Sequence, residues 1–347
     1  MLEVFTRQLA ASEPLAQEQI ALAVEDLVDE TVSPDAKADF LCELARKGET
    51  VQEIAAFTRA LRQKSIEPPL DLRWREAHEI LDVCGTGGDR LNTFNISTTV
   101  ALICAAAGVP VAKHGNRAIT SQAGSADVLE ALGVRIDLPP ADAAASLRER
   151  NFAFFFAPNY HPAFKYIAPA RKVCAERGQR TIFNFLGPLL NPARPGAQLV
   201  GVPLPELCEP LAKVLQSLGV RRAMVVCGAA QDQQWLDELS TLGDNNIAEF
   251  YHERGFSTSV LSLDGFPLQR ASLTDLCGSD RHANAQIVKR LLDGQERGPK
   301  RDAVLLNCAA ALFVAGRART LANGWDLASE VIDNGQARSK LQELLVS

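Results

Sequence analysis

The spacing of hydrophobic residues changes near residue 70 and divides the chain into two parts. Before that point, apolar residues recur at the period of a helix with one buried face, as in Leu15, Ile20, Ala23, Val24 and Leu27. Capping signals mark two helix starts: Ser33 is followed by proline, and Thr50 is followed three residues later by Glu53. The first part is therefore predicted to contain helices only.

After residue 73 the pattern changes to short apolar runs that end at glycine or polar clusters, which is typical of buried strands. The expected strands are 80–83, 109–112, 152–156, 199–202 and 223–227, followed by a hairpin-like region at 247–263. Helical patterns separate the strands, and this alternation predicts an α/β fold with a mainly parallel sheet flanked by helices. We expect a small helical domain at 1–72, against which the 160–190 region packs, and an α/β domain at 73–347.

Composition narrows the class of protein without deciding its function. Hydrophobic residues make up 47% and charged residues 22% of the chain, as in ordinary globular enzymes. The net charge of −6 argues against a general basic surface for nucleic acid or an anionic membrane, so any anion site must be a local pocket. The eight cysteines include no Cys-x-x-Cys pair, the first residues lack the apolar core of a signal peptide, and no apolar run could span a bilayer. These features predict a cytoplasmic protein.

Polar and glycine-rich clusters follow the first two strands of the α/β part and precede helices. Gly85–Asp89 ends the first strand, Lys113–Arg117 ends the second, and Asn95–Thr98 and Gly124–Ser125 open the helices that follow. In open α/β sheets, ligands bind at the carboxyl ends of strands, and N–H groups at glycine turns and helix starts favour anions. Together the clusters predict a site for a polyphosphate ligand.

Neither of the common phosphate-binding loops fits these residues. A Walker loop needs Gly-Lys-Ser/Thr, which does not follow the glycines, and Arg90 stands where a dinucleotide fingerprint needs a third small residue. Taken alone, Gly85–Asp89 is also compatible with a plain strand–turn–helix connection.

Longer motifs support a specific resemblance. The chain carries, in order, GTGGD, NTFNIST, KHGNR, GSADVLEALG, FAPNYHPAFK, Arg171, RTIFNFLGPLLNPA, Leu236-Asp237-Glu238 and Asn284-Ala285. In order and spacing these resemble the anthranilate phosphoribosyltransferases of tryptophan biosynthesis over nearly the whole chain, and KHGN and GPLxNP are the most specific signatures. The resemblance implies transfer of phosphoribosyl from 5-phosphoribosyl 1-diphosphate (PRPP) to the amine of anthranilate. It also implies Mg²⁺, with two ions expected, and a homodimer with contacts through the small helical domain.

The resemblance assigns PRPP to the polar clusters described above. The implied donor-binding residues are Gly85, Gly88, Asp89, Thr93, Asn95, Ile96, Ser97, Thr98, Lys113, His114, Gly115, Asn116, Arg117, Ala118, Ile119, Thr120, Ser121 and Ser125. Glycine allows the backbone to approach phosphate closely, and the Ser97 hydroxyl can bind magnesium as P-loop hydroxyls do. From the residues alone, Ser97 and Thr98 can also be interpreted as helix caps, and Lys113 as an interfacial lysine whose amine reaches solvent.

The implied anthranilate site combines residues from both glycine clusters and the aromatic loop, namely Gly85, His114, Asn116, His161, Phe164 and Arg171. The planar guanidinium of Arg171 matches a carboxylate with two parallel hydrogen bonds, although an arginine on a helix is more commonly a surface residue. His161 and Phe164 either wall the acceptor pocket or pack in the core. His114 is either a base or a structural histidine, and no general base is assigned.

The implied metal ligands are Ser97, Asp237 and Glu238. Carboxylate oxygens suit magnesium, which binds through one or two carboxylates plus substrate phosphates, whereas an acidic pair in a loop is ordinarily solvated. The chain departs from the family pattern at three places: Arg90-Leu91 and Gln122-Ala123 near the donor clusters, and Trp235 before the acidic pair. None of them replaces a residue assigned to chemistry.

Two alternative functions share this fold. A pyrimidine nucleoside phosphorylase would use free phosphate and a nucleoside, and the KHGN and GPLxNP segments argue against it. A non-enzymatic nucleic-acid-binding paralogue would show a basic surface and eroded motifs, which the net charge of −6 and the intact GTGGD and Asp237-Glu238 oppose.

Overall fold

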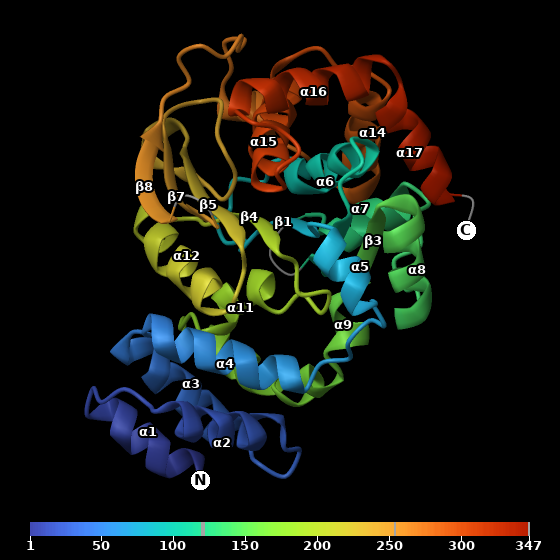
Figure 1. Cartoon of the computed structure of the whole chain (residues 1–347). Helices are drawn as coiled ribbons and strands as arrows, with labels where there is room; N and C mark the ends of the chain where they lie inside the picture. The colour runs from blue at the N-terminus through green and yellow to red at the C-terminus, as the bar shows by residue number, and fades with distance from the viewer. Residues whose placement is uncertain (119–121, 253–254, 346–347) are drawn as a thin grey trace.

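The computed structural model describes residues 1–118, 122–252 and 255–345 (Figure 1). The N-terminal part is helical, as predicted, and its helices are α1 (Leu2–Ala10), α2 (Gln17–Val28), α3 (Pro34–Lys47) and α4 (Val51–Gln63). Ser33 Oγ accepts from the Ala36 N–H at 3.3 Å, and Thr50 and Glu53 exchange two hydrogen bonds at 3.1 and 2.9 Å. The predicted capping signals are therefore confirmed, and they fix the starts of α3 and α4.

The remaining chain is built on one mixed sheet. Its strands are β1 (Leu81–Gly85), β2 (Val111–Gly115), β3 (Phe152–Phe156), β4 (Ala197–Gly201), β5 (Arg222–Ala229), β6 (Trp235–Leu236), β7 (Asn245–Tyr251) and β8 (Gly255–Leu261). The order is β3-β2-β1-β4-β5-β7-β8, with β6 paired to the end of β5. Strands β1 to β5 are parallel and the last three are antiparallel, so the predicted fold class is confirmed.

Helices cover both faces of the sheet. The helices are α5 (Leu72–Ala77), α6 (Ile96–Ala106), α7 (Ser125–Ala131), α8 (Pro140–Arg150), α9 (Ala157–Tyr160), α10 (Ala168–Glu176), α11 (Phe183–Leu189), α12 (Cys208–Ser217), α13 (Leu273–Leu276), α14 (Arg281–Leu292), α15 (Pro299–Val314), α16 (Leu321–Asp333) and α17 (Gln336–Leu345), with 3₁₀ turns at Pro162–Tyr166, Pro205–Leu207 and Gln231–Gln233. Figure 1 shows α6 and α14–α17 on one side of the sheet and α11, α12 and the N-terminal helices on the other. Within the described residues, no helix has the length and apolar character needed to cross a membrane.

Successive residues of each strand point to opposite faces, and in the parallel strands β1 to β5 both faces are mostly buried, whereas β8 is mostly exposed. Val83 and Leu199 join the hydrophobic cluster that contains α6 and α15, whereas Val200 and Val225 join a second cluster with α12. This second cluster is continuous with the N-terminal helices and with α10 and α11. The small helical part therefore shares its core with the rest of the chain.

The 160–190 region lies against the N-terminal helices. The buried Lys37 of α3 donates a hydrogen bond to the backbone oxygen of Tyr166 at 2.9 Å, and Arg177 forms an ion pair with Asp39 at 2.6 Å. Cys42 of α3 and Cys174 of α10 lie 3.6 Å apart, sulfur to sulfur. These contacts join two segments of the chain that are far apart in the sequence.

A buried polar layer of Asp82, Gln198 and Asn191 lies at the centre of the sheet, and hydrophobic patterning did not predict it. Asp82 and Gln198 are paired on β1 and β4 and are both inaccessible to solvent. Asn191 donates to Asp82 Oδ2 at 2.8 Å and to the Ala112 carbonyl at 2.7 Å, and Gln198 donates to the Pro188 carbonyl at 3.0 Å. The polar layer thus fastens the chain after α11 to the centre of the sheet.

The burial of Asp82 predicts a pH dependence of stability. Burial raises its pKa from 3.8 to about 6, against hydrogen bonding by Asn191 and attraction by Lys113. The folded state therefore binds this proton more tightly than the unfolded chain, and that stabilisation is lost as the pH rises from the unfolded pKa through about 6. When the pH is raised from 5 to 7.5, the free energy of unfolding of Asp82→Asn should increase by about 1.4 kcal/mol relative to that of the wild type, which corresponds to one pKa unit. Urea unfolding at both pH values measures the difference.

Asp137→Asn, at an exposed position, is the control for the loss of one carboxylate. A stability difference between Asp82→Asn and wild type that stays constant with pH would show that Asp82 is charged in the folded state throughout.

Candidate active site

The predicted donor loop lies where the strand order reverses. From β1, the sheet continues to β2 and β3 on one side and to β4 and β5 on the other. Gly85 ends β1, and the Thr86 N–H donates to the carbonyl of Gly201 at the end of β4 at 2.9 Å. In open parallel sheets this reversal leaves a crevice at the carboxyl ends of the strands, which is where ligands bind. The predicted donor loop therefore lies at the edge of the sheet where a ligand crevice is expected.

Two glycines at these strand ends make room for the acidic pair. A Cβ on Gly85 would lie 2.2 Å from Asp237 Oδ2, and a Cβ on Gly201 would lie 1.6 Å from the Asp237 carbonyl oxygen. Both distances are far below van der Waals contact, so side chains at either position would displace the loop. Glycine is required here for close approach.

Backbone and side-chain hydrogen bonds hold the acidic pair against the donor loop. Asp237 Oδ2 accepts from the Gly87 N–H at 2.7 Å, and Glu238 Oε1 accepts from the Ser97 N–H at 3.1 Å. Immediately afterwards, Asn307 of α15 exchanges hydrogen bonds of 2.9 and 2.8 Å with the backbone of Leu239. The structure thus brings Ser97 together with the acidic pair, although Ser97 and Glu238 are 141 residues apart.

The electrostatics of the acidic pair fit a bound cation. Burial, then repulsion by Asp89 and Glu238, holds the pKa of Asp237 well above its usual range. Burial raises the pKa of Glu238 to about 7, although Lys113 opposes the shift. A divalent cation would relieve this excess of negative charge. Within the described residues, no group of three or more His, Cys, Asp or Glu side chains is placed to hold a metal.

Lys113 is buried, so the interpretation of it as a solvent-reaching lysine is wrong. Its side chain is 1% exposed, and its amine donates to the Val83 carbonyl at 2.8 Å and to Ser97 Oγ at 3.3 Å. Burial lowers the pKa of Lys113, whereas Asp82, Cys84 and Glu238 raise it. The lysine therefore lies directly behind the Ser97 hydroxyl.

The start of α6 places the next donor residues. Asn95 is the N-cap, and its amide accepts from Asn284 Nδ2 at 2.9 Å and donates to the Ala123 carbonyl at 3.2 Å. Ile96, Ser97 and Thr98 form the first turn, so the interpretation of Ser97 and Thr98 as helix caps is wrong. The buried hydroxyl of Thr98 has no hydrogen-bond partner among the described residues. Thr93, just upstream, pairs with Cys277 in an isolated bridge.

The KHGNR segment turns back onto α7. Arg117 forms ion pairs with Asp127 at 3.1 Å and Glu130 at 2.9 Å, and Asn116 Oδ1 accepts from the Arg117 N–H at 2.7 Å. Ser125 lies against this turn. Its hydroxyl oxygen is 3.5 Å from the Asn116 carbonyl oxygen, and a Cβ on Gly115 would lie 2.2 Å from the same hydroxyl oxygen. The Ala118 N–H donates to Asp127 at 2.9 Å. Ile119, Thr120 and Ser121 lie outside the described residues.

Three of the predicted acceptor residues, His114, His161 and Phe164, form one continuous row of rings with Phe183, which was not among the predicted residues. Ring centroids are 5.2 Å apart for His114 and His161, 5.0 Å for His161 and Phe164, and 5.7 Å for Phe164 and Phe183. The Arg171 guanidinium lies 5.2 Å from the Phe183 centroid. Burial lowers the pKa of Arg171, and within the described residues its side chain has no ion pair. A half-buried arginine without a carboxylate partner is suited to bind an anionic group of a ligand.

The two histidines are neutral and hydrogen-bonded to each other. Burial lowers the pKa of His114 to about 3 and that of His161 to about 4. His114 Nδ1 lies 3.2 Å from the Gly187 carbonyl, which only accepts, so Nδ1 carries the proton and Nε2 is the acceptor. His161 Nε2, at 3.3 Å, then donates to His114 Nε2. Because its acceptor nitrogen is occupied, His114 is better explained as a structural residue than as a base.

The three departures from the family pattern lie around the site. Arg90 is exposed and has φ of 60°, a left-handed conformation, and Gln122 is exposed. Trp235 forms the short strand β6, which pairs with Ala229, and packs against the cluster that includes α12. Trp235 thus helps to hold the chain that enters the acidic pair.

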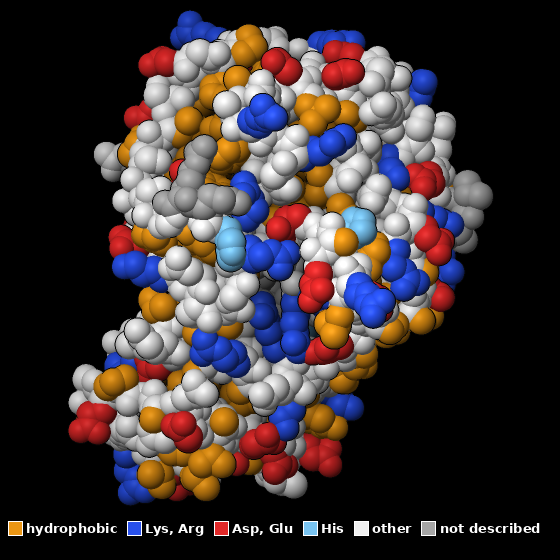
Figure 2. Space-filling model, in the orientation of Figure 1, with side chains coloured by type: hydrophobic (Ala, Val, Ile, Leu, Met, Phe, Trp, Pro, Cys, Tyr) orange, Lys and Arg blue, Asp and Glu red, His pale blue; other side chains and the backbone are white. Residues whose placement is uncertain are grey.

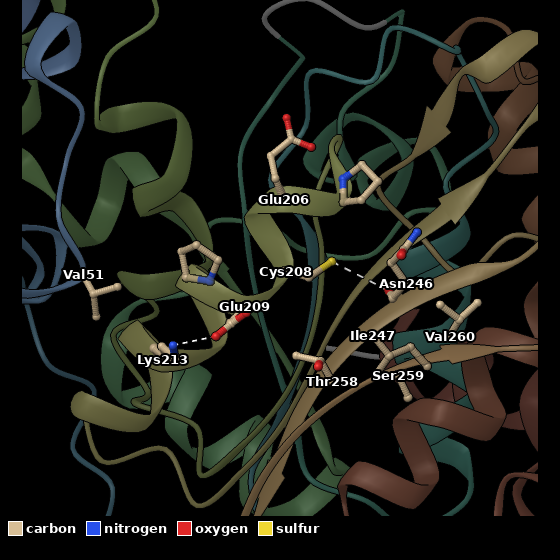
Figure 3. A pocket seen from close by; sticks show the side chains of 12 residues that line it. Val51, Glu206, Cys208, Glu209, Lys213, Asn246, Ile247, Thr258, Ser259 and Val260 are labelled. Atoms are coloured by element: carbon tan, nitrogen blue, oxygen red, sulfur yellow. Dashed lines mark hydrogen bonds and ion pairs between the residues drawn. The ribbon is translucent and has the colours of Figure 1, made fainter.

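A cavity of about 650 Å³ lies away from these residues, between α12 and the β7–β8 hairpin (Figure 3). Its lining includes the ion pair of Lys213 with Glu209 at 2.6 Å and the contact of Cys208 Sγ with the Asn246 carbonyl at 3.7 Å. None of the residues predicted for substrate or metal lines this cavity.

Comparison with known proteins first defines the class. A family model described as "Glycosyl transferase family, a/b domain" matches residues 77–338, and one described as "Glycosyl transferase family, helical bundle domain" matches residues 4–65. A curated anthranilate phosphoribosyltransferase from Petrotoga mobilis is 43% identical over 345 residues, which cover 99% of this chain and 96% of the relative. The chain therefore belongs to the anthranilate phosphoribosyltransferase family.

Solved structures agree with this family over the whole length. The enzyme from Thermus thermophilus has a TM-score of 0.87 and 40% identity, covering 98% of each chain. The Saccharomyces cerevisiae enzyme in complex with PRPP and Mg has a TM-score of 0.85 and 27% identity, covering 99% of this chain and 96% of that one. The same yeast enzyme is also known in complex with 4-fluoroanthranilate, with a TM-score of 0.84 and 25% identity over the same shares.

Proposed function

We propose that this chain transfers the phosphoribosyl group of PRPP to the amine of anthranilate, giving N-(5-phosphoribosyl)anthranilate and pyrophosphate. The observation that carries the proposal is the position of the Asp237–Glu238 pair, which lies against the donor loop and Ser97 at the carboxyl ends of β1 and β4. The family membership supports the same reaction, which is the second step from chorismate to tryptophan.

The donor is bound by the loop after β1, the start of α6 and the KHGNR turn. Ser97, Asp237 and Glu238 hold magnesium, and Lys113 positions the Ser97 hydroxyl and contributes positive charge behind the phosphates. The other donor residues that the structure describes lie in or beside these three segments, although the ion pairs of Arg117 with Asp127 and Glu130 leave less of its charge for phosphate.

In the reaction, the bond from ribose C1 to the diphosphate oxygen breaks and its electron pair leaves with pyrophosphate. The aromatic amine forms the new C1–N bond and releases one proton to water. When bound, magnesium neutralises charge on the diphosphate and makes it a better leaving group. Arg171 holds the acceptor carboxylate, and Asn116, His161 and Phe164 orient the ring. Positioning and electrostatics supply most of the acceleration.

The test is the fluorescence of anthranilate after addition of PRPP and Mg²⁺, which should fall as product forms. Loss of fluorescence that requires both additions supports the proposal. Phosphorolysis of uridine or thymidine without consumption of anthranilate would instead identify a pyrimidine nucleoside phosphorylase. The net charge of −6 argues against a nucleic-acid-binding paralogue, and the basic side chains on the face shown gather in the central hollow while acidic ones lie around it (Figure 2).

Replacement of Lys113 tests its role toward the donor. Lys113→Met keeps most of the side-chain volume but removes the charge, so the KM for PRPP should rise roughly ten- to a hundredfold, as expected for a charged hydrogen bond. The KM for anthranilate should change much less. Steady-state kinetics with each substrate varied in turn measure both constants.

Lys37→Met is the matched control, because Lys37 is also buried and donates to two backbone carbonyls at 2.6 and 2.9 Å, but lies in the N-terminal helices. Both variants should lose thermal stability, and only Lys113→Met should affect PRPP. An unchanged KM and kcat for PRPP would make Lys113 purely structural.

The remaining assignments concern assembly and location. We propose a cytoplasmic homodimer, two Mg²⁺ ions per site, and a small domain made of residues 1–72 with the 160–190 region. Exposed apolar residues on the first two helices, Val4 at 53% and Leu22 at 45%, support a contact surface there. Light scattering coupled to size exclusion should give twice the 37.5 kDa chain mass, and the dimer should dissociate when Val4 and Leu22 are replaced by Asp.

A further inference from the structure

Arg180 lies over the donor loop, and neither the motifs nor the proposed mechanism has so far given it a role. It belongs to the turn between α10 and α11, where its side chain is exposed. Its Nη2 lies 3.8 Å from the point that a Cβ on Gly88 would occupy. Gly88 has φ of 96° and carries no side chain, so no side chain of this residue separates the loop backbone from the guanidinium. Within the described residues, the Arg180 guanidinium makes no hydrogen bond or ion pair.

The turn that carries Arg180 belongs to the wall of the crevice opposite the sheet. Its N-terminal side is attached to α3, because Arg177 pairs with Asp39 at 2.6 Å and Cys174 Sγ contacts the Ala38 carbonyl at 3.6 Å. Its C-terminal side continues into α11, whose end is fastened to the sheet through Asn191. Arg180 therefore reaches from a well-anchored segment across to the donor loop.

Both signs of charge occur at this end of the loop. The Asp237 carboxylate lies against the loop, because it accepts from the Gly87 N–H at 2.7 Å, and Asp89 and the exposed Arg90 follow Gly88 in the chain. Lys113 is buried and its amine contacts the Ser97 hydroxyl, so it is not on the exposed side of the loop. Arg180 supplies a positive charge to the loop from a different segment of the chain, beside the carboxylate of Asp237 that the loop already binds.

We propose that Arg180 binds the diphosphate of the donor and remains in contact with it as the leaving group. This inference rests on the proposed function. As the C1–O bond breaks, its electron pair adds negative charge to the diphosphate, and a guanidinium already in place stabilises that charge. The planar fork can donate two hydrogen bonds to one phosphate, which a lysine cannot reproduce. Arg171 binds the carboxylate of the acceptor, so the two arginines bind different substrates.

The experiment measures pyrophosphate binding directly, without turnover. Isothermal titration of the full-length protein with pyrophosphate and Mg²⁺ should show affinity reduced about ten- to thirtyfold in Arg180→Ala, the range for one charge-assisted contact. Arg180→Lys should recover only part of the loss. In steady-state assays, kcat/KM for PRPP should fall by a similar factor, while KM for anthranilate at saturating PRPP should stay within about twofold.

Lys172→Ala is the matched control, because Lys172 is on the adjacent helix α10, 81% exposed and paired only with Glu176 at 4.0 Å among the described residues. It removes the same charge from the same wall and should leave pyrophosphate binding unchanged. Equal losses in Lys172→Ala and Arg180→Ala would show a general charge effect and overturn the proposal.

Two further outcomes would also overturn it: pyrophosphate affinity in Arg180→Ala equal to wild type, or a rise in the anthranilate KM without a change for pyrophosphate. Failure of the proposed function is distinguishable, because the wild-type protein would then bind Mg²⁺ and pyrophosphate without consuming anthranilate in the presence of PRPP. Circular dichroism of each variant checks that the fold is kept.

Discussion

Replacing Asp237 by Asn and Glu238 by Gln together is expected to reduce turnover about a thousandfold, since metal stabilisation of the leaving group contributes several kcal/mol. The amide oxygens can still accept from the Gly87 and Ser97 N–H groups, so the loop should keep its geometry. Burial raises the pKa of both carboxyls and Asp89 repels both, so their removal should increase thermal stability in the absence of metal. Turnover against Mg²⁺ concentration and thermal unfolding with a chelator measure the two effects.

Asp244→Asn is the matched control, because Asp244 is an exposed carboxylate in the loop that leads from the acidic pair to β7. It should retain wild-type turnover. Full activity of the double variant, or of the wild type in excess chelator, would refute the assignment of this pair to the metal.

Replacement of Arg171 is expected to affect the acceptor selectively. Its guanidinium lies against Phe183 and is half-buried, and it has no ion pair among the described residues. Arg171→Ala should raise the KM for anthranilate roughly ten- to a hundredfold, the range for a charged hydrogen bond. Arg171→Lys should also be impaired, because an ammonium cannot form the paired hydrogen bonds of a guanidinium. Steady-state kinetics with PRPP and anthranilate varied separately measure the effect.

The neighbouring Lys172→Ala serves as the control for loss of a positive charge from α10. Equal damage to both substrates, or unchanged anthranilate kinetics with a native circular dichroism spectrum, would place the acceptor carboxylate elsewhere.

Most of the helices and strands could be predicted because they depend on interactions between residues that are close in the sequence. Ser33 and the Thr50–Glu53 pair act within one helical turn, and the capping they predict is present. The hairpin-like region at 247–263 is also present as β7 and β8. The parallel strands could be predicted from short apolar runs because they are buried on both faces.

The candidate site could be located, but its contacts could not be predicted from the residues alone. The sequence shows Lys113 after an apolar run, but its burial depends on Val83 and Ser97, which lie 30 and 16 residues away. Asp82 and Asn191 are 109 residues apart, and hydrophobic periodicity carries no information about such a pair. The row from His114 to Phe183 likewise joins separate segments of the chain. Only the resemblance to a family assigned Lys113, Ser97 and the rings of His114, His161 and Phe164 to one site, and it gave no role to Asp82, Asn191 or Phe183.

The hydrophobic cluster shared by the N-terminal helices and α10–α12 determines how this chain can be recombined with its relatives. The two family models meet between residues 65 and 77, which suggests a natural point for exchange. The cluster extends across that boundary, because Leu41 and Phe57 pack in the same core as Ile167 and Leu211. A chimaera that exchanges only residues 1–65 would place foreign side chains against α10, the helix that carries Arg171. A compatible exchange must therefore transplant the 160–190 segment together with the N-terminal helices, and with it one wall of the crevice.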